Sequence, residues 1–142
     1  MCGLNGIIKI GEVNQESLLQ ELTEMNDLIV HRGPDDSGTY FKNLENVSFC
    51  MGMRRLSIID LNSGSQPIFN DDKSIVIVFN GEIYNYKVLK SELEKEGVLF
   101  NTNSDTEVIL KLYEKKGVDC FNMLNGMFAF SIYDKNKNKI FI

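Results

Sequence analysis

One apolar run, Ser74 to Phe79 (SIVIVF), constrains the fold more than any other segment of the chain. A strand that is apolar at nearly every position is typical of one with both faces buried, because a strand with one wet face alternates apolar and polar residues. The run stops at Asn80-Gly81, a dipeptide typical of turns. We therefore expect a central strand over residues 74–79 that ends at this dipeptide and is covered on both sides.

The rest of the chain alternates strand patterns with helix patterns, which predicts an α+β fold of layered architecture. A length of 142 residues suits one domain. Further strands are expected over residues 4–10, 39–42, 47–53, 98–100, 128–133 and 139–142, and residues 127–130 (MFAF) are interpreted as core. The expected helices are one capped by Asn14 with Leu18, Leu22, Met25 and Ile29 on one stripe, one over 86–96 with Leu89 and Leu93 inward, and one that opens with a capping box at 104–107 and ends at 115–117.

Composition excludes several classes of function. The net charge of −5 argues against nonspecific nucleic-acid binding. Three widely spaced cysteines and one histidine fit neither a disulfide framework nor a zinc site, so no metal is expected. The chain has no apolar run of 18 residues and no signal-peptide pattern, so we expect no membrane association and a cytosolic location.

Cys2 is the best candidate nucleophile. A thiolate is the reactive form of cysteine, and a free thiol has a pKa of about 8.5, whereas an α-amino group has a pKa of about 7.7–8.0. If Met1 is removed, which the small second residue favours, Cys2 carries both groups, and its amine can accept the thiol proton without a histidine. The alternative is a cysteine in a frayed terminus.

Three other features support a site for an amino acid with a side-chain amide. Asn80 and Gly81 can stabilise an oxyanion, although taken by themselves they are better explained by a plain turn. Arg55 can hold a carboxylate through two parallel bonds, or it can lie on the surface or pair with Asp60. Asp105 can bind an ammonium group, or it can simply serve the start of a helix. Together they describe a site for glutamine, with asparagine as the near competitor.

The sequence resembles the N-terminal glutaminase domain of glutamine-hydrolysing asparagine synthetases, which are class II (N-terminal nucleophile) glutamine amidotransferases. The resemblance covers nearly the whole chain in the family's order. The segments that carry it are MCGLNGII, HRGPDDSGTY, RRLSIIDL, QPIFN, FNGEIYNY, NSDTEVIL and LNGMFAFSIYD.

The resemblance implies a four-layer αββα fold with two antiparallel sheets between helices. It implies that Cys2 is the nucleophile, that Asn80 and Gly81 form the oxyanion hole, and that the products are glutamate and ammonia. It implies no cofactor in this domain, and ATP with Mg²⁺ in a synthetase domain that receives the ammonia to amidate aspartate. The implied substrate-binding residues are Arg55, Leu56, Ser57, Ile58, Ile59, Glu82 and Asp105, with Arg32 in support.

Two departures from the family's pattern matter. Met53 stands where relatives often have histidine, and we expect it to pack as an apolar substitute. The family's domain continues past Ile142, so we interpret residues 2–142 as its N-terminal part. Two alternatives stay open: a truncated, non-catalytic binding or dimerisation module, and the glutaminase part of an enzyme that amidates a sugar or peptide carboxylate.

Overall fold

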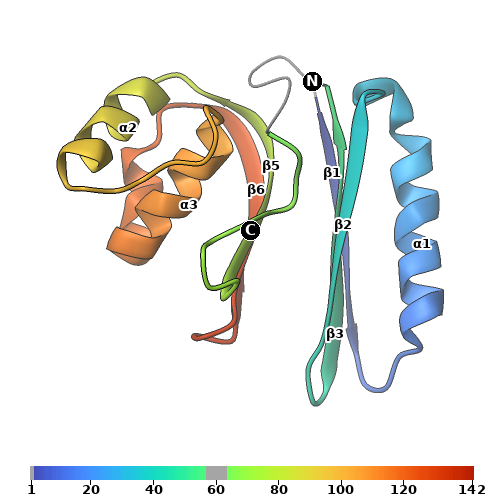
Figure 1. The fold of residues 1–142 in the computed structure, drawn as a ribbon. Coiled ribbons are helices and arrows are strands. Elements are labelled where there is room, and N and C mark those ends of the chain that lie inside the picture. The colour runs from blue at the N-terminus through green and yellow to red at the C-terminus, as the bar shows by residue number, and fades with distance from the viewer. Residues whose placement is uncertain (1, 57–63) are drawn as a thin grey trace.

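The computed structural model describes residues 2–56 and 64–142, and in these ranges two antiparallel sheets lie face to face (Figure 1). The first sheet has the order β1-β3-β2 and the second has the order β4-β5-β6-β7. The strands are β1 (Gly3–Ile10), β2 (Asp36–Asn43), β3 (Val47–Arg55), β4 (Ile68–Phe69), β5 (Ile75–Ile83), β6 (Gly126–Asp134) and β7 (Lys139–Phe141).

Helices cover the outer face of each sheet, so the four-layer αββα architecture is confirmed (Figure 1). Helix α1 (Gln15–Leu28) lies on the first sheet, while α2 (Tyr86–Lys95) and α3 (Asp105–Lys116) lie on the second. The 3-10 helix η1 (Val30–Arg32) follows α1, and the 3-10 helix η2 (Gly117–Met123) follows α3. None of the described helices is both long and apolar enough to span a bilayer.

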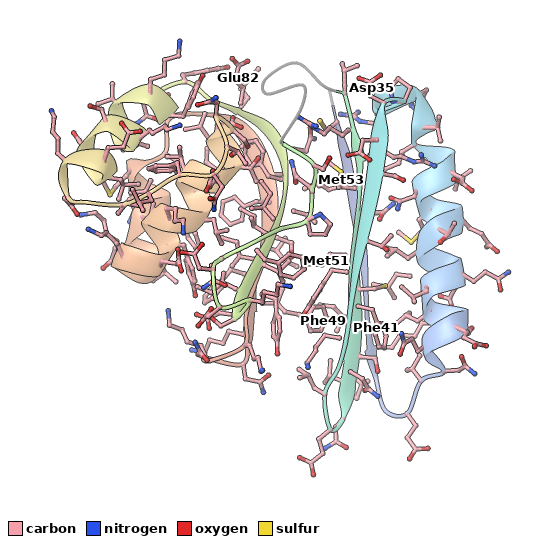
Figure 2. All side chains as sticks on the ribbon, viewed as in Figure 1. Asp35, Phe41, Phe49, Met51, Met53 and Glu82 are labelled. Atoms are coloured by element: carbon pink, nitrogen blue, oxygen red, sulfur yellow. The ribbon has the colours of Figure 1, made fainter. Side chains whose placement is uncertain are left out.

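The two faces of β5 enter different cores, as the apolar run predicts. Val76 and Val78 pack between the sheets, against Phe49, Met51 and Met53 of β3. These three β3 side chains point into the space between the sheets in Figure 2. Met53 is fully buried there, so its predicted role as an apolar packing residue is confirmed. The other face of β5 packs against α2 and α3, through Ile75, Ile77 and Phe79.

The prediction that this strand stops at Asn80-Gly81 is wrong. β5 continues to Ile83, with Asn80 opposite Ala129 and Gly81 opposite Phe128 in β6. A turn dipeptide stays extended here because the neighbouring strand pairs with it, and tertiary pairing outweighs local preference. The Asn80 side chain and the Gly81 backbone therefore belong to a paired strand instead of a turn.

Two local predictions around α2 and α3 need correction. Residues 98–100 form no strand, because the Val98 N–H turns back to the Leu93 carbonyl and closes the end of α2. The capping box is only half formed. The Ser104 hydroxyl accepts from the Thr106 N–H, but the Glu107 carboxylate accepts from the backbone and hydroxyl of Thr102 instead of returning to Ser104.

Residues 127–130 were expected in the core, and this prediction is wrong for residues 127–129, which are exposed, whereas Phe130 is partly buried against the core. Met127 is 68% exposed and Phe128 is 38% exposed. The strand β7 pairs with β6 only over Ile132 to Asp134, so in the described part of the chain this half of β6 is a sheet edge.

Candidate active site

Residues from both sheets line one cavity of about 130 Å³ at the end of the molecule where the chain begins. Its walls come from the residue before β1, the end of β3, the far end of β5 and the first turn of α3. The described lining residues are Cys2, Arg55, Leu56, Gly64, Gln66, Phe79, Asn80, Gly81, Glu82, Ser104, Asp105, Thr106 and Met127.

The Cys2 thiol is held against the backbone at the end of β3. The Leu56 N–H donates to Sγ at 3.3 Å, and Sγ lies 3.7 Å from the Leu56 carbonyl oxygen. The Arg32 Nε donates to the Cys2 carbonyl at 3.1 Å, which supports the predicted position of Arg32 beside the site. Cys2 is therefore fixed through both its side chain and its backbone, unlike a residue in a frayed terminus.

Asn80 and Gly81 reach the cavity from the second sheet. Side chains alternate along a strand, so Asn80 shares the inner face with Val76 and Val78 and points toward the first sheet. Its Oδ1 is buried without a hydrogen-bond partner among the described residues. A buried amide atom without a partner costs free energy, and such groups are common where a ligand supplies the missing partner.

The backbone conformation at residue 81 requires a glycine. Its φ is +146°, and a Cβ at this position would lie 2.2 Å from the Met127 carbonyl oxygen. Both the conformation and the space exclude a side chain. Gly81 itself is one of the residues that line the cavity.

Arg55 is only 6% exposed, although it carries a full charge. It ends β3 on the face that carries Met53, which is the face turned toward the second sheet. A planar guanidinium that lines a cavity is suited to bind a carboxylate through two parallel hydrogen bonds.

Asp105 provides the opposite charge, and it is 5% exposed at the first residue of α3. Burial raises the pKa of its carboxyl above the ordinary aspartate value, against the lowering effect of the Ile83 and Thr106 N–H groups, while the Glu82 charge raises it further. The N-cap of α3 is Ser104, so Asp105 is not the capping side chain, although it lies in the first turn and its Oδ2 accepts from the Ile83 N–H at 3.0 Å. A buried carboxylate that faces a cavity is suited to bind a cation.

Of the other predicted residues, Leu56 and Glu82 line the cavity, whereas Ser57, Ile58 and Ile59 lie outside the described residues. No feature of the residues Gln66 and Thr106 themselves predicted that they line the cavity. Their only signal was membership of the family segments QPIFN and NSDTEVIL. No group of three or more His, Cys, Asp or Glu side chains in the described ranges is arranged to hold a metal ion.

Comparison with known proteins gives relatives over the whole chain. A family described as "Glutamine amidotransferase domain" matches residues 1–142. The chain is 48% identical to asparagine synthetase [glutamine-hydrolyzing] 2 of Bacillus subtilis and 40% identical to asparagine synthetase B [glutamine-hydrolyzing] of Escherichia coli. Each comparison covers 100% of this chain, but the chain spans only 18% and 24% of the lengths of these two relatives.

The fold is also found in a solved structure. Glutamine phosphoribosylpyrophosphate amidotransferase of B. subtilis superposes with a TM-score of 0.69 at 22% identity, over 93% of this chain and 35% of that one. At this identity the likeness establishes the N-terminal-nucleophile amidotransferase fold and nothing more.

Proposed function

This chain belongs to the glutamine amidotransferase family, as a domain of the asparagine synthetase (glutamine-hydrolysing) type, and we propose that it hydrolyses L-glutamine to L-glutamate and ammonia. The observation that carries the proposal is the shared cavity of Cys2, Arg55, Asn80 and Asp105. These four groups come from opposite sheets and from a helix, and no local feature of the sequence requires them to meet.

The charges of the cavity match a zwitterionic amino acid. In the proposed complex, Arg55 binds the α-carboxylate of glutamine, and Asp105 binds the α-ammonium group. Leu56 and Glu82, which line the cavity, complete the described part of the binding surface. The side-chain carboxamide then extends toward the Cys2 Sγ. Two fixed charges hold the reacting carbon near the nucleophile, which lowers the entropic part of the barrier.

The chemistry needs only Cys2 and a pair of hydrogen-bond donors. Once Met1 is removed, the Cys2 α-amine takes the thiol proton, and Sγ attacks the carboxamide carbon. The Asn80 Nδ2 and the Gly81 N–H stabilise the oxyanion. The amine returns its proton to the leaving nitrogen, and ammonia departs from a glutamyl thioester. Water then attacks the thioester, which releases glutamate and regenerates the thiol.

In the larger enzyme, we propose that the ammonia amidates aspartate, since the relatives are named asparagine synthetases. ATP and Mg²⁺ would act in that second reaction, and the glutaminase step uses no cofactor. A sugar or peptide carboxylate is the alternative acceptor. A cytosolic location of the protein and the formation of a homodimer remain predictions.

The second candidate is a non-catalytic binding or dimerisation module. The observation that favours it is the exposure of the apolar side chains of Met127 and Phe128 on β6 within the described residues. Unpaired strand edges and apolar side chains are suited to pair with another chain.

The test is glutamate release by protein whose intact mass shows that Met1 is absent. We expect the rate to rise with pH between about 7 and 8, as the Cys2 amine loses its proton. A flat profile between about pH 6 and 9 would contradict the role of this amine. A non-catalytic module would release no glutamate at any pH.

A further inference from the structure

Gln66 lies where the two halves of the cavity meet. It lines the cavity and is 8% exposed. Its backbone is pressed onto the first sheet at Gly38 of β2, where a Cβ would lie 1.9 Å from the Gln66 carbonyl oxygen. A side chain at residue 38 would therefore displace Gln66, and the glycine fixes this backbone against the sheet that carries Cys2.

The Gln66 side chain reaches in the other direction, to the second sheet and α3. Its Oε1 accepts from the Phe79 N–H at 2.6 Å, and its Nε2 donates to the Thr106 hydroxyl at 3.4 Å. Phe79 directly precedes Asn80, and Thr106 directly follows Asp105. One buried amide thus connects the neighbours of two proposed site residues to the sheet of the nucleophile.

We propose that Gln66 is a positioning residue of the glutaminase site. It fixes the position of Asn80 relative to Cys2 and, more weakly, the position of Asp105 relative to these two residues. The proposal rests on the proposed function. Gln66 acts through its neighbours and takes no part in proton transfer.

The two hydrogen bonds predict different kinetic effects. The bond to Phe79 is short, and it fixes the strand position next to the oxyanion donor, where small displacements reduce transition-state stabilisation. The bond to Thr106 is near the upper limit of hydrogen-bond length and fixes the residue next to the ammonium partner. Loss of both should therefore lower kcat more than it raises KM.

The chain contains a matched control in Asn70. This buried amide is 6% exposed. Its Oδ1 accepts from the Ile75 N–H at 2.8 Å, and its Nδ2 donates to the Glu114 Oε1 at 2.9 Å. It connects β5 to α3 as Gln66 does. Its contact on β5 is Ile75 instead of Phe79, which lies about 13 Å away along the strand at roughly 3.3 Å per residue.

The experiment compares Gln66→Met with Asn70→Leu in Met1-free protein. Both variants lose a buried amide, so we expect a lower unfolding midpoint in each. In Gln66→Met we expect kcat for glutamine to fall at least tenfold with KM changed less than threefold. In Asn70→Leu we expect both constants within twofold of the parent. Equal kinetic losses in the two variants, or an unchanged kcat in Gln66→Met, would overturn the proposal.

A second variant covers the case in which Gln66→Met does not fold. Gln66→Glu keeps the acceptor for the Phe79 N–H, so we expect its kcat within threefold of the parent. A tenfold fall in kcat at an unchanged unfolding midpoint would count against positioning by this bond.

Different measurements test the proposed function and the proposed role of Gln66. If the parent releases no glutamate, the proposed function fails. The inference is then measured by the rate at which a chloroketone analogue of glutamine alkylates Cys2. Slower alkylation in Gln66→Met than in Asn70→Leu supports positioning, and equal rates overturn it.

Discussion

Asp105 illustrates how the fold and the proposed site make opposite demands on one residue. Burial raises the pKa of its carboxyl, so the folded state favours the neutral form. Its contribution to stability is present below the ordinary aspartate pKa and is lost as pH rises through the raised value. Near neutral pH the charged carboxylate therefore costs stability, and a bound ammonium group is the compensation that the proposed site provides.

We predict that Asp105→Asn raises KM for glutamine about tenfold or more and lowers kcat less, because it removes a substrate charge partner. The unfolding midpoint should rise near neutral pH, and this gain should shrink in acid. Steady-state kinetics and denaturation across pH test both effects.

Glu107→Gln is the control for this substitution. Glu107 is another buried carboxylate of α3, and it accepts from the Asn101 and Thr102 N–H groups instead of facing the cavity. We expect it to lose stability and to keep the parent KM. The same rise in KM in both variants would argue against a specific ammonium partner.

Gly81 gives a prediction about backbone geometry. Gly81→Ala should cost about 1–3 kcal/mol, since it combines a strained φ with a clash against the Met127 carbonyl. Gly97→Ala is the control, because Gly97 also has a positive φ, +83°, but its Cβ would meet open space. It should cost only about 1 kcal/mol. Equal losses in urea denaturation would mean that the clash is relieved at no cost.

At the residue scale, the sequence indicated candidate site residues, and the structure brings Cys2, Arg55, Asn80 and Asp105 together in one cavity. The residue types at Cys2, Arg55 and Asp105 each allowed a plain structural role, and it is their shared cavity that favours the proposed roles. Gln66 was missed because an amide in a turn-rich loop has no chemical signature. Its importance comes from the distant residues 79 and 106, which the sequence does not place beside it.

Among the elements, the burial of both faces of β5 was predicted correctly, but its end was placed four residues too early, at Phe79 instead of Ile83. Its buried pattern reflects contact with layers on both faces, and this pattern is local. Its end depends on β6, which pairs as far as Ile83 with Gly126. The expected strand at 98–100 fails for a similar reason, since strand residues without a pairing partner form only a connection.

The link between α3 and the turn after β6 gives a prediction at this scale. The Tyr113 hydroxyl donates to the Asp134 Oδ2 at 2.8 Å. Burial alone would raise the pKa of Asp134, but hydrogen bonds from the Lys137 N–H, the Tyr113 hydroxyl and the Lys137 ammonium together lower it. A lowered pKa contributes stability above the ordinary aspartate value, which is lost as pH falls through the lowered one.

Tyr113→Phe should therefore destabilise the protein by about 1–3 kcal/mol near neutral pH, because it leaves a buried carboxylate with one partner fewer. The difference from the parent should shrink as pH falls and Asp134 is protonated. Denaturant titrations between about pH 3 and 7 measure it. A difference that stays constant with pH would show that Asp134 is not the group affected.

For the whole molecule, the proposed site exists only because two sheets lie face to face. Cys2 directly precedes β1 of the first sheet, Arg55 ends β3 of the same sheet, and Asn80 belongs to the second sheet. Patterns along the chain predicted strands and layers, but they could not predict which sheet each strand joins, because strand pairing is set by contacts distant in sequence. The family resemblance supplied that arrangement, and the fold confirms it.

The central claim is that Cys2, as the first residue of the processed chain, cleaves glutamine. Glutamate release from glutamine tests it most directly, compared among Met1-free parent, protein that retains Met1, and Cys2→Ala. We predict release by the Met1-free parent and none by the other two. Equal rates in the parent and Cys2→Ala would contradict the account.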